Sequence, residues 1–227
     1  MAVKPQFARF EALGAPGWAA LEAVTEAARE AGLLVVADGK RGDVPVSAAA
    51  YADALFGSTD TPWGSFGGLG ADAATLNPLM GEDSLEPLVD AAAAAGAGIF
   101  VLVRTSNPGA ADFLDLDGSG GPLHEQIARC VDRFAERLAG AGGFSGAGAV
   151  VGATEPRFLA RLRELMPRAI FLLPGVGAQG GSAGELEAAF SGPGSALVTA
   201  SRSVASAPDP AAAAEELRAQ VWSIAGD

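Results

Sequence analysis

The stretch "VVADGKRGDVPVSAAAYA", residues 35–52, contains the pattern on which the predicted fold depends. Its apolar start belongs to a run at 33–38 that has the composition of a strand buried on both faces. Asp38, Lys40 and Asp43 follow this run closely, and the alanine-rich segment after Pro45 predicts a helix. One strand, one polar turn and one helix make the repeating unit of an α/β protein.

The same unit recurs along the chain. Short apolar runs predict buried strands at 2–5, 33–38, 72–78, 98–106, 148–154, 169–175 and 195–201. Amphipathic segments between and after these runs predict helices, among them 17–32, 123–140, 156–166 and 209–226. This alternation predicts parallel strands joined by right-handed crossovers, in a single domain over residues 1–227.

Seven predicted strands fit either a doubly wound sheet or a TIM (β/α)8 barrel that lacks one strand. Polar residues and glycine follow the predicted strands in a regular way, at Asp38, Lys40, Asn77, Ser106, Thr154, Gly175 and Arg202. A barrel gathers its active site at the carboxyl ends of its strands. The sequence therefore predicts a barrel.

Composition excludes several classes of function. The net charge of −12 disfavours nucleic acid and anionic membranes as partners, because both bind basic surfaces. No apolar run reaches the ~18 residues of a membrane span, and the start has no secretory pattern. Cys130 is the single cysteine, which excludes an internal disulfide framework or a cysteine zinc site. A cytoplasmic protein without membrane or nucleic-acid partners is expected.

The two lysines stand out in this composition. Fifteen residues are lysine or arginine, yet only Lys4 and Lys40 are lysines. An ammonium group is a compact charge that can give up a proton, whereas a guanidinium group stays protonated. Each lysine follows one of two consecutive predicted strands, so both are expected to meet Asp38 at one rim. The alternative is a solvated turn with exposed ion pairs.

Three further segments predict contacts to a ligand, and two of them suit an anion. In "PGVGAQGG", 174–181, glycines allow backbone N–H groups to approach an anion, and Arg202 in "TASRS", 199–203, can pair with a phosphate. In "VRTSNPGA", 103–110, Ser106 could bind the edge of a heterocycle. Ordinary turns are the alternative for both glycine-rich and Ser-Asn-Pro-Gly segments.

Two other features of the sequence lie outside these motifs. The glycine-rich segment 57–70, "GSTDTPWGSFGGLG", is expected to be a long loop, either a mobile lid or a loose connection. His124 is the only histidine, and we expect it to be exposed or partly packed on its helix, without a catalytic role.

The motifs together resemble orotidine 5′-phosphate decarboxylase, specifically its longer bacterial, type 2 branch. The resemblance covers almost the whole chain, through "VKPQFARFEALG", "DGKRGDVPVSAAAYA", "VLVRTSNPGA", "GAVVGAT", "LLPGVGAQGG" and "ASRS" in the order and spacing of the family. It implies a TIM barrel that converts orotidine 5′-monophosphate to uridine 5′-monophosphate in pyrimidine biosynthesis, with no cofactor and no metal. It also implies a homodimer.

The resemblance also implies roles for individual residues. Lys40 would protonate C6 of the pyrimidine, and Asp38 would lie against the departing carboxylate. With Lys4 they form a charged tetrad whose fourth member, Asp43, reaches into the site of the other subunit. Ser47 stands where the family usually has threonine and would contact the ligand across the dimer interface. The remaining residues implied to bind substrate are Ser106 at the base and, at the phosphate, Gly177, Gln179, Ser201 and Arg202.

The resemblance fails at the start of the chain. The family's first strand carries a Gly-x-Asp-Pro type motif with an aspartate that binds ribose, and here only residues 1–3 precede Lys4. We expect a chain truncated relative to the family by about 40–50 residues, one strand and helix of a barrel. Two alternatives remain: a magnesium-dependent sugar-phosphate decarboxylase or aldolase of the same suprafamily, and a non-catalytic phosphoribosyl-ligand binder or inactive fragment.

Overall fold

The computed structural model describes residues 1–153, 156–175 and 183–226. Contacts within the chain divide it into two compact units. Unit 1 holds residues 1–101 and 136–138, and unit 2 holds 102–135 and 139–227.

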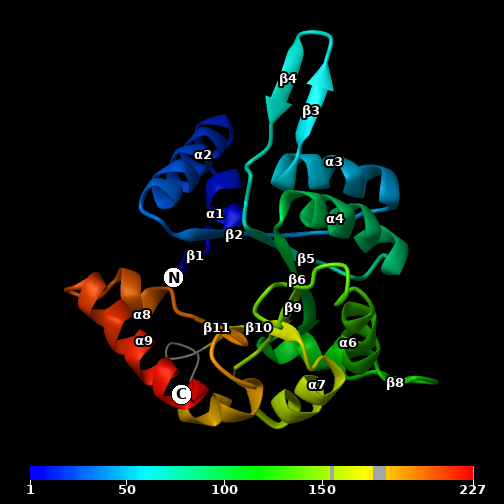
Figure 1. Ribbon diagram of the computed structural model, residues 1–227, viewed down its shortest axis with the longest axis vertical. Helices are drawn as coiled ribbons and strands as arrows, with labels where there is room; N and C mark the ends of the chain where they lie inside the picture. The colour runs from blue at the N-terminus through cyan, green and yellow to red at the C-terminus, as the bar shows by residue number, and fades with distance from the viewer. Residues whose placement is uncertain (154–155, 176–182, 227) are drawn as a thin grey trace. The chain divides into compact units, whose positions relative to one another are not determined.

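Unit 1 alternates strands and helices from its first residues (Figure 1). Its elements are β1 (Ala2–Val3), α1 (Phe7–Glu11), α2 (Ala15–Glu30), β2 (Leu34–Arg41), α3 (Pro45–Phe56), β3 (Ser58–Thr61), β4 (Gly64–Gly67), β5 (Ala73–Leu76), α4 (Glu82–Ala95) and the first part of β6 (Gly98–Arg104). Helices α3 and α4 pack side by side (Figure 1). On α4 the buried residues recur at helical spacing, which gives it one apolar face: Ser84, Leu85, Leu88, Val89 and Ala92.

Unit 2 continues the alternation with shorter elements. These are the end of β6, η1 (Pro108–Ala110), α5 (Ala111–Leu114), β7 (Asp117–Gly118), β8 (Gly121–Pro122), α6 (Leu123–Arg133), β9 (Ser145–Val151), η2 (Pro156–Phe158), α7 (Leu159–Leu165), β10 (Ala169–Pro174), η3 (Ala183–Ala189), β11 (Ala196–Thr199), α8 (Arg202–Ala205) and α9 (Pro210–Ala225). Its core contains fully buried Leu159, Leu162 and Phe171.

The parallel strands follow one another in the sheet in the order β1-β2-β5-β6-β9-β10-β11. Each new parallel strand therefore lies beside the previous one, without the reversal that defines a doubly wound sheet. The predicted α/β class is confirmed, and every predicted strand is present with shifts of a few residues at its ends. The order is that of a (β/α) barrel.

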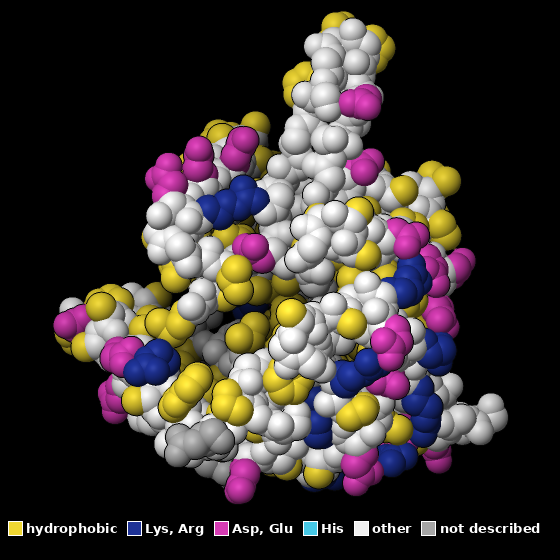
Figure 2. Space-filling view, viewed as in Figure 1, with side chains coloured by type: hydrophobic (Ala, Val, Ile, Leu, Met, Phe, Trp, Pro, Cys, Tyr) yellow, Lys and Arg dark blue, Asp and Glu magenta, His cyan; other side chains and the backbone are white. Residues whose placement is uncertain are grey.

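The segment 57–70 is not a structureless loop, which corrects the expectation from its glycine content. It contains the antiparallel hairpin β3–β4, with Thr59 opposite Phe66 and Thr61 opposite Gly64. The hydroxyl of Thr61 closes the turn, because it donates to the carbonyl of Gly64 (2.9 Å) and accepts from the N–H of Trp63 (3.2 Å). The hairpin projects from unit 1 with Trp63 and Phe66 exposed (Figures 1 and 2).

Two further expectations are corrected in unit 2. The helix predicted at 123–140 ends at Arg133. His124 is buried, with 5% of its surface exposed, and its Nδ1 lies 2.7 Å from the carbonyl oxygen of Leu114. Over the described residues, no helix is long and apolar enough to cross a membrane.

Candidate active site

A buried carboxylate lies between two lysines in unit 1. Asp38 lies in β2, and only 5% of its surface is exposed. Lys40 Nζ donates to Asp38 Oδ1 over 2.5 Å, and Lys4 Nζ donates to Oδ2. Lys4 directly follows β1, which pairs with β2 in parallel. The predicted meeting of these three residues at neighbouring strands is confirmed.

The two ammonium groups keep Asp38 ionised. Burial by itself raises the pKa of this carboxyl group, but hydrogen bonds from Lys4 and Lys40 and the attraction of their charges lower it further than burial raises it. The pKa of Asp38 is therefore below its usual value. A fixed arrangement of two cations around one carboxylate is preorganised before any ligand binds.

A β-bulge in β2 sets the direction in which the side chains of Asp38 and Lys40 point. Between the pairs Ala37–Ala74 and Arg41–Leu76, β2 advances by four residues while β5 advances by two. This bulge re-aims the side chains within it. Lys40 has a φ of 47°, and it is the one non-glycine residue with positive φ over the described ranges. Such backbone outliers persist where surrounding contacts enforce them, often at functional sites.

Two residues that hold Asp38 were not identified from the sequence. Thr75, in β5, donates from Oγ1 to Asp38 Oδ1 (2.9 Å) and accepts the backbone N–H of Lys40 (2.9 Å). Gln6, with its amide nitrogen turned toward Asp38, lies 3.0 Å from Oδ2 and 2.7 Å from the backbone oxygen. A hydroxyl group within the apolar run "AATL" was the signal that could have indicated Thr75.

Steric contact explains why glycine stands between Asp38 and Lys40. A Cβ on Gly39 would lie 2.8 Å from Cδ2 of Phe7, which is buried at the start of α1. Asp38-Gly39-Lys40 therefore packs against the start of α1, which follows Val-Lys-Pro, and the two motifs form one arrangement.

The model of the family described as orotidine 5′-phosphate decarboxylase / HUMPS matches residues 1–217.

The chain belongs to this family. A curated orotidine 5′-phosphate decarboxylase of Rhodopirellula baltica is 46% identical over 206 residues, and one of Deinococcus radiodurans is 50% identical over 204. Both alignments cover 89% of the chain, and they cover 66% and 70% of the relatives, respectively. A relative from Caldicellulosiruptor bescii is 40% identical over 185 residues. This alignment covers 82% of the chain and 61% of the relative.

Solved structures of the family have the same fold. The structure of Leishmania donovani OMP decarboxylase is 38% identical and has a TM-score of 0.81. The match covers 98% of this chain and 80% of that one. A TIM-barrel type α/β fold, as predicted, is thereby shown for the chain.

The other predicted members of the decarboxylase site in unit 1 lie at the start of α3. Asp43 is half-buried, and its Oδ1 accepts the backbone N–H of Val44 (2.7 Å). Within the described part of the chain, no ion pair joins Asp43 to Lys4 or Lys40. Ser47 is half-buried one turn later. The structure thus brings together three of the four tetrad residues and leaves Asp43 to local contacts.

The residues predicted to bind base and phosphate belong to unit 2. Ser106 is half-buried directly after β6. Ser201 and Arg202 are exposed after β11, where Arg202 begins α8. Gly177 and Gln179 lie outside the described residues.

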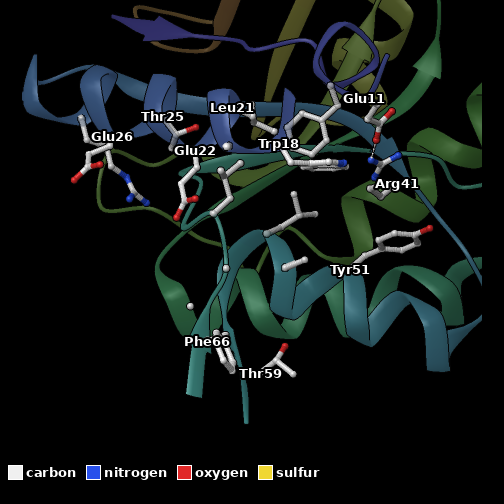
Figure 3. A pocket seen from close by; sticks show the side chains of 18 residues that line it. Glu11, Trp18, Leu21, Glu22, Thr25, Glu26, Arg41, Tyr51, Thr59 and Phe66 are labelled. Carbon is white, nitrogen blue, oxygen red and sulfur yellow. Dashed lines mark hydrogen bonds and ion pairs between the residues drawn. The ribbon is translucent and has the colours of Figure 1, made fainter. Parts of the chain in front are cut away.

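A separate cleft of about 1040 Å³ opens on unit 1 (Figure 3). Trp18, Tyr51 and Phe66 are among its lining residues, from α2, α3 and β4. Arg41 also lines it, pairs with Glu11 and lies 5.6 Å above the ring of Tyr51. None of the charged cluster around Asp38 lines this cleft. The family's chemistry is therefore expected at the cluster and not in the cleft.

Proposed function

We propose that the chain decarboxylates orotidine 5′-monophosphate to uridine 5′-monophosphate, without cofactor or metal, in pyrimidine biosynthesis. The proposal goes beyond membership of the family, because the chain spans only 61–70% of the three curated relatives described above. The observation that carries it is the Lys4–Asp38–Lys40 cluster, in which two lysines hold the buried carboxylate of Asp38. The cytoplasmic location expected from the sequence stays a prediction.

In the proposed reaction, the bond between C6 and the carboxylate breaks and its electron pair remains on C6. Carbon dioxide leaves, and a proton moves from Lys40 Nζ to C6. A carbanion at this carbon is poorly delocalised, so a fixed positive charge beside it supplies stabilisation that water would have to reorganise to provide. Lys40 supplies both the charge and the proton, whereas an arginine would supply only the charge.

Asp38 has a second part in the proposal. Its ionised carboxylate would lie against the substrate carboxylate, and loss of carbon dioxide would remove that repulsion. Lys4, Thr75 and Gln6 prevent Asp38 from turning away or taking up a proton, because together they occupy both of its oxygens. Binding energy from the distant phosphate would hold the reacting carboxylate in place.

The phosphate and base contacts are also proposals. Ser106 would bind the pyrimidine, and Arg202 and Ser201 would bind the phosphate with Gly177 and Gln179. The exposed position of Arg202 at the start of α8, shortly after β11, supports the phosphate contact. Arginine is suited to it, because its planar group can form two parallel hydrogen bonds with phosphate.

We further propose a homodimer in which Asp43 and Ser47 complete the site of the partner subunit. Asp43 has no ion pair with its own lysines in the described part of the chain, so its carboxylate remains available for another subunit. Apolar side chains are exposed beside it, with Val44 at 49% and Val46 at 87%. Leu79, after β5, is 81% exposed. Burial of such residues is what an interface would provide.

The decisive experiment is turnover of orotidine 5′-monophosphate by the purified 227-residue chain in EDTA, followed by ultraviolet absorbance. Turnover in EDTA supports the proposal. Activity only on sugar phosphates after addition of Mg²⁺ would support the magnesium-dependent alternative. A folded chain that binds nucleotide without turnover would support the non-catalytic alternative. Circular dichroism on the same sample establishes whether the chain is folded.

A further inference from the structure

An ion pair between the buried Arg104 and the half-buried Asp115 lies at the end of β6, immediately before the predicted base-binding turn. Arg104 is 3% exposed and is the last residue of the strand. Its Nε and Nη2 donate to the two oxygens of Asp115, over 2.8 and 3.1 Å. This two-bond geometry fixes the plane of the guanidinium group as well as its position.

The third nitrogen of the same group contacts the turn itself. Arg104 Nη1 donates to the carbonyl oxygen of Thr105 over 2.7 Å. Thr105 Oγ1 in turn donates to Asn107 Oδ1, also over 2.7 Å. The guanidinium group therefore connects the backbone of the turn 105–107 to Asp115, which follows α5.

The turn is also pressed against the end of β9. The N–H of Gly152 donates to the carbonyl oxygen of Arg104 over 2.7 Å. A Cβ on Gly152 would lie 2.7 Å from Cα and 2.8 Å from Cβ of Ser106. The backbone of Ser106 thus rests directly on Gly152, and a small movement of the turn would displace its side chain.

The rings of Phe158 and His124 lie beside the ion pair. The ring of Phe158 lies 4.9 Å from the guanidinium carbon of Arg104 and 4.9 Å, edge to face, from the ring of His124. His124 Nδ1 is 3.3 Å from Asp115 Oδ1. Hydrogen bonds from Arg104 lower the pKa of Asp115 by more than the partial burial of Asp115 raises it. Asp115 remains charged, so the ion pair persists at neutral pH.

We propose that Arg104 is a positioning residue that holds the turn 105–107, and with it Ser106, in place for the pyrimidine base of the ligand. The inference rests on the proposed function, which assigns the base contact to Ser106. Arg104 does not touch the ligand; it acts through Thr105 and Asp115. Its loss should weaken the binding of a ligand that has the base and spare one that lacks it.

The test compares uridine 5′-monophosphate with ribose 5-phosphate by calorimetry, for the wild type and Arg104→Met. We expect affinity for the nucleotide to fall by about tenfold or more, the effect of one well-made hydrogen bond. Affinity for ribose 5-phosphate should stay within about twofold. An equal loss for both ligands, or no loss, would overturn the proposal.

Arg163→Met is the matched control. Arg163 is a half-buried arginine of unit 2. Like Arg104 it lies over an aromatic ring, with its guanidinium carbon 3.8 Å from the centre of the Phe171 ring, and it donates to backbone carbonyls, among them Ala169 (2.6 Å) and Ala189 (2.7 Å). Burial lowers its pKa to about 10. Its hydrogen bonds go to the backbone carbonyls of Met166, Ala169, Ala189 and Ser195 and not, within the described residues, to the turn 105–107, so its replacement should leave the ratio of the two affinities unchanged.

Asp115→Asn covers the case in which Arg104→Met does not fold. It keeps the shape of the side chain and removes the charge. Affinity for uridine 5′-monophosphate should again fall relative to that for ribose 5-phosphate, but by less than in Arg104→Met. A uniform loss in Asp115→Asn would also reject the proposal. Arg104→Lys should restore only part of the nucleotide affinity, because an ammonium group cannot reproduce three fixed hydrogen bonds. Because these readouts are binding ratios, they remain interpretable if the wild type does not decarboxylate orotidine 5′-monophosphate.

Discussion

At the scale of single residues, the proposed chemistry depends on which cation is held against a buried carboxylate. Lys40 reaches Asp38 from a backbone conformation that few side chains adopt, and a bulge in β2 holds it there. The next residue, Arg41, makes different contacts, with Glu11 and the rings of Phe7 and Tyr51. Two adjacent cations therefore serve different purposes.

Lys40→Arg tests the proton transfer. The variant keeps a positive charge beside Asp38 but loses a group that can give up a proton, so turnover should fall by at least about a thousandfold. Affinity for uridine 5′-monophosphate should change little. Arg41→Lys is the control, since it exchanges the same two residue types one position along the chain, and it should retain most activity. Near-normal turnover in Lys40→Arg would refute the assignment of Lys40 as proton donor.

Asp38 also predicts a dependence of stability on pH. Its pKa in the folded chain is lower than that of an unfolded chain, ~3.9, so its charge stabilises the fold above that value. This contribution is lost as pH falls through the folded-state pKa. The free energy of unfolding, measured with urea from neutral pH downward, should decrease more steeply in the wild type than in Asp38→Asn. Other carboxyl groups are common to both proteins and cancel in the difference, so parallel curves would contradict the prediction.

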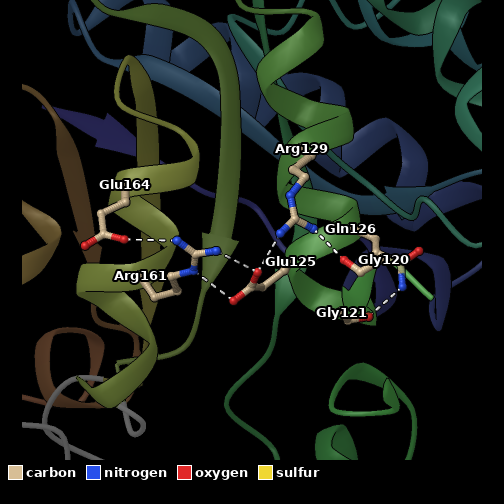
Figure 4. A network of polar contacts seen from close by, with 7 residues as sticks. All are labelled: Gly120, Gly121, Glu125, Gln126, Arg129, Arg161 and Glu164. Carbon is tan, nitrogen blue, oxygen red and sulfur yellow. Dashed lines mark hydrogen bonds and ion pairs between the residues drawn. The ribbon is translucent and has the colours of Figure 1, made fainter. Parts of the chain in front are cut away.

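At the scale of elements, a polar network connects α6, α7 and the β7–β8 hairpin (Figure 4). Glu125 is its centre, because it accepts two hydrogen bonds from Arg161 (2.9 and 3.0 Å) and one from Arg129 (2.7 Å). Arg129 also donates to the carbonyl of Gly120 (2.9 Å). Hydrogen bonds from Arg161 lower the pKa of Glu125, and so the network is charged at neutral pH.

Glu125→Gln should lower the thermal denaturation midpoint and reduce its sensitivity to salt, since exposed ion pairs are screened. Glu164→Gln is the matched control: Glu164 accepts one hydrogen bond from the same Arg161 (3.1 Å) and is 68% exposed. Differential scanning calorimetry at low and high salt measures both. A shift for Glu164→Gln as large as that for Glu125→Gln would contradict a central role for Glu125.

At the scale of the whole molecule, the proposed dimer makes each site depend on two subunits. Lys40→Met and Asp43→Asn should each be inactive alone, because each removes one contribution to every site. A mixed dimer keeps one intact site, with Lys40 from one subunit and Asp43 from the other. Random exchange of subunits should therefore restore roughly one quarter of wild-type activity. If a mixture that has exchanged subunits stays inactive, Asp43 does not act across an interface.

Much of the molecule could be predicted from local pattern. Hydrophobic periodicity located the parallel strands, and the position of Lys4 and Lys40 after consecutive strands indicated that both would reach Asp38. Local pattern failed at two places. In segment 57–70 the glycine content indicated a loop, whereas Thr59 and Phe66 pair in the antiparallel hairpin β3–β4. His124 is buried because Phe158, distant in sequence, packs on its ring.

The sequence by itself determined the family, the order of strands and helices, and the residues that carry charge at the ends of neighbouring strands, because these are properties of residue type and spacing. Only the tertiary structure decided how these residues meet. The unequal advance of β2 and β5 and the hydroxyl of Thr75 on Asp38 depend on contacts between segments far apart in the chain. Such contacts form when the sheet pairs, and no short stretch of sequence encodes them.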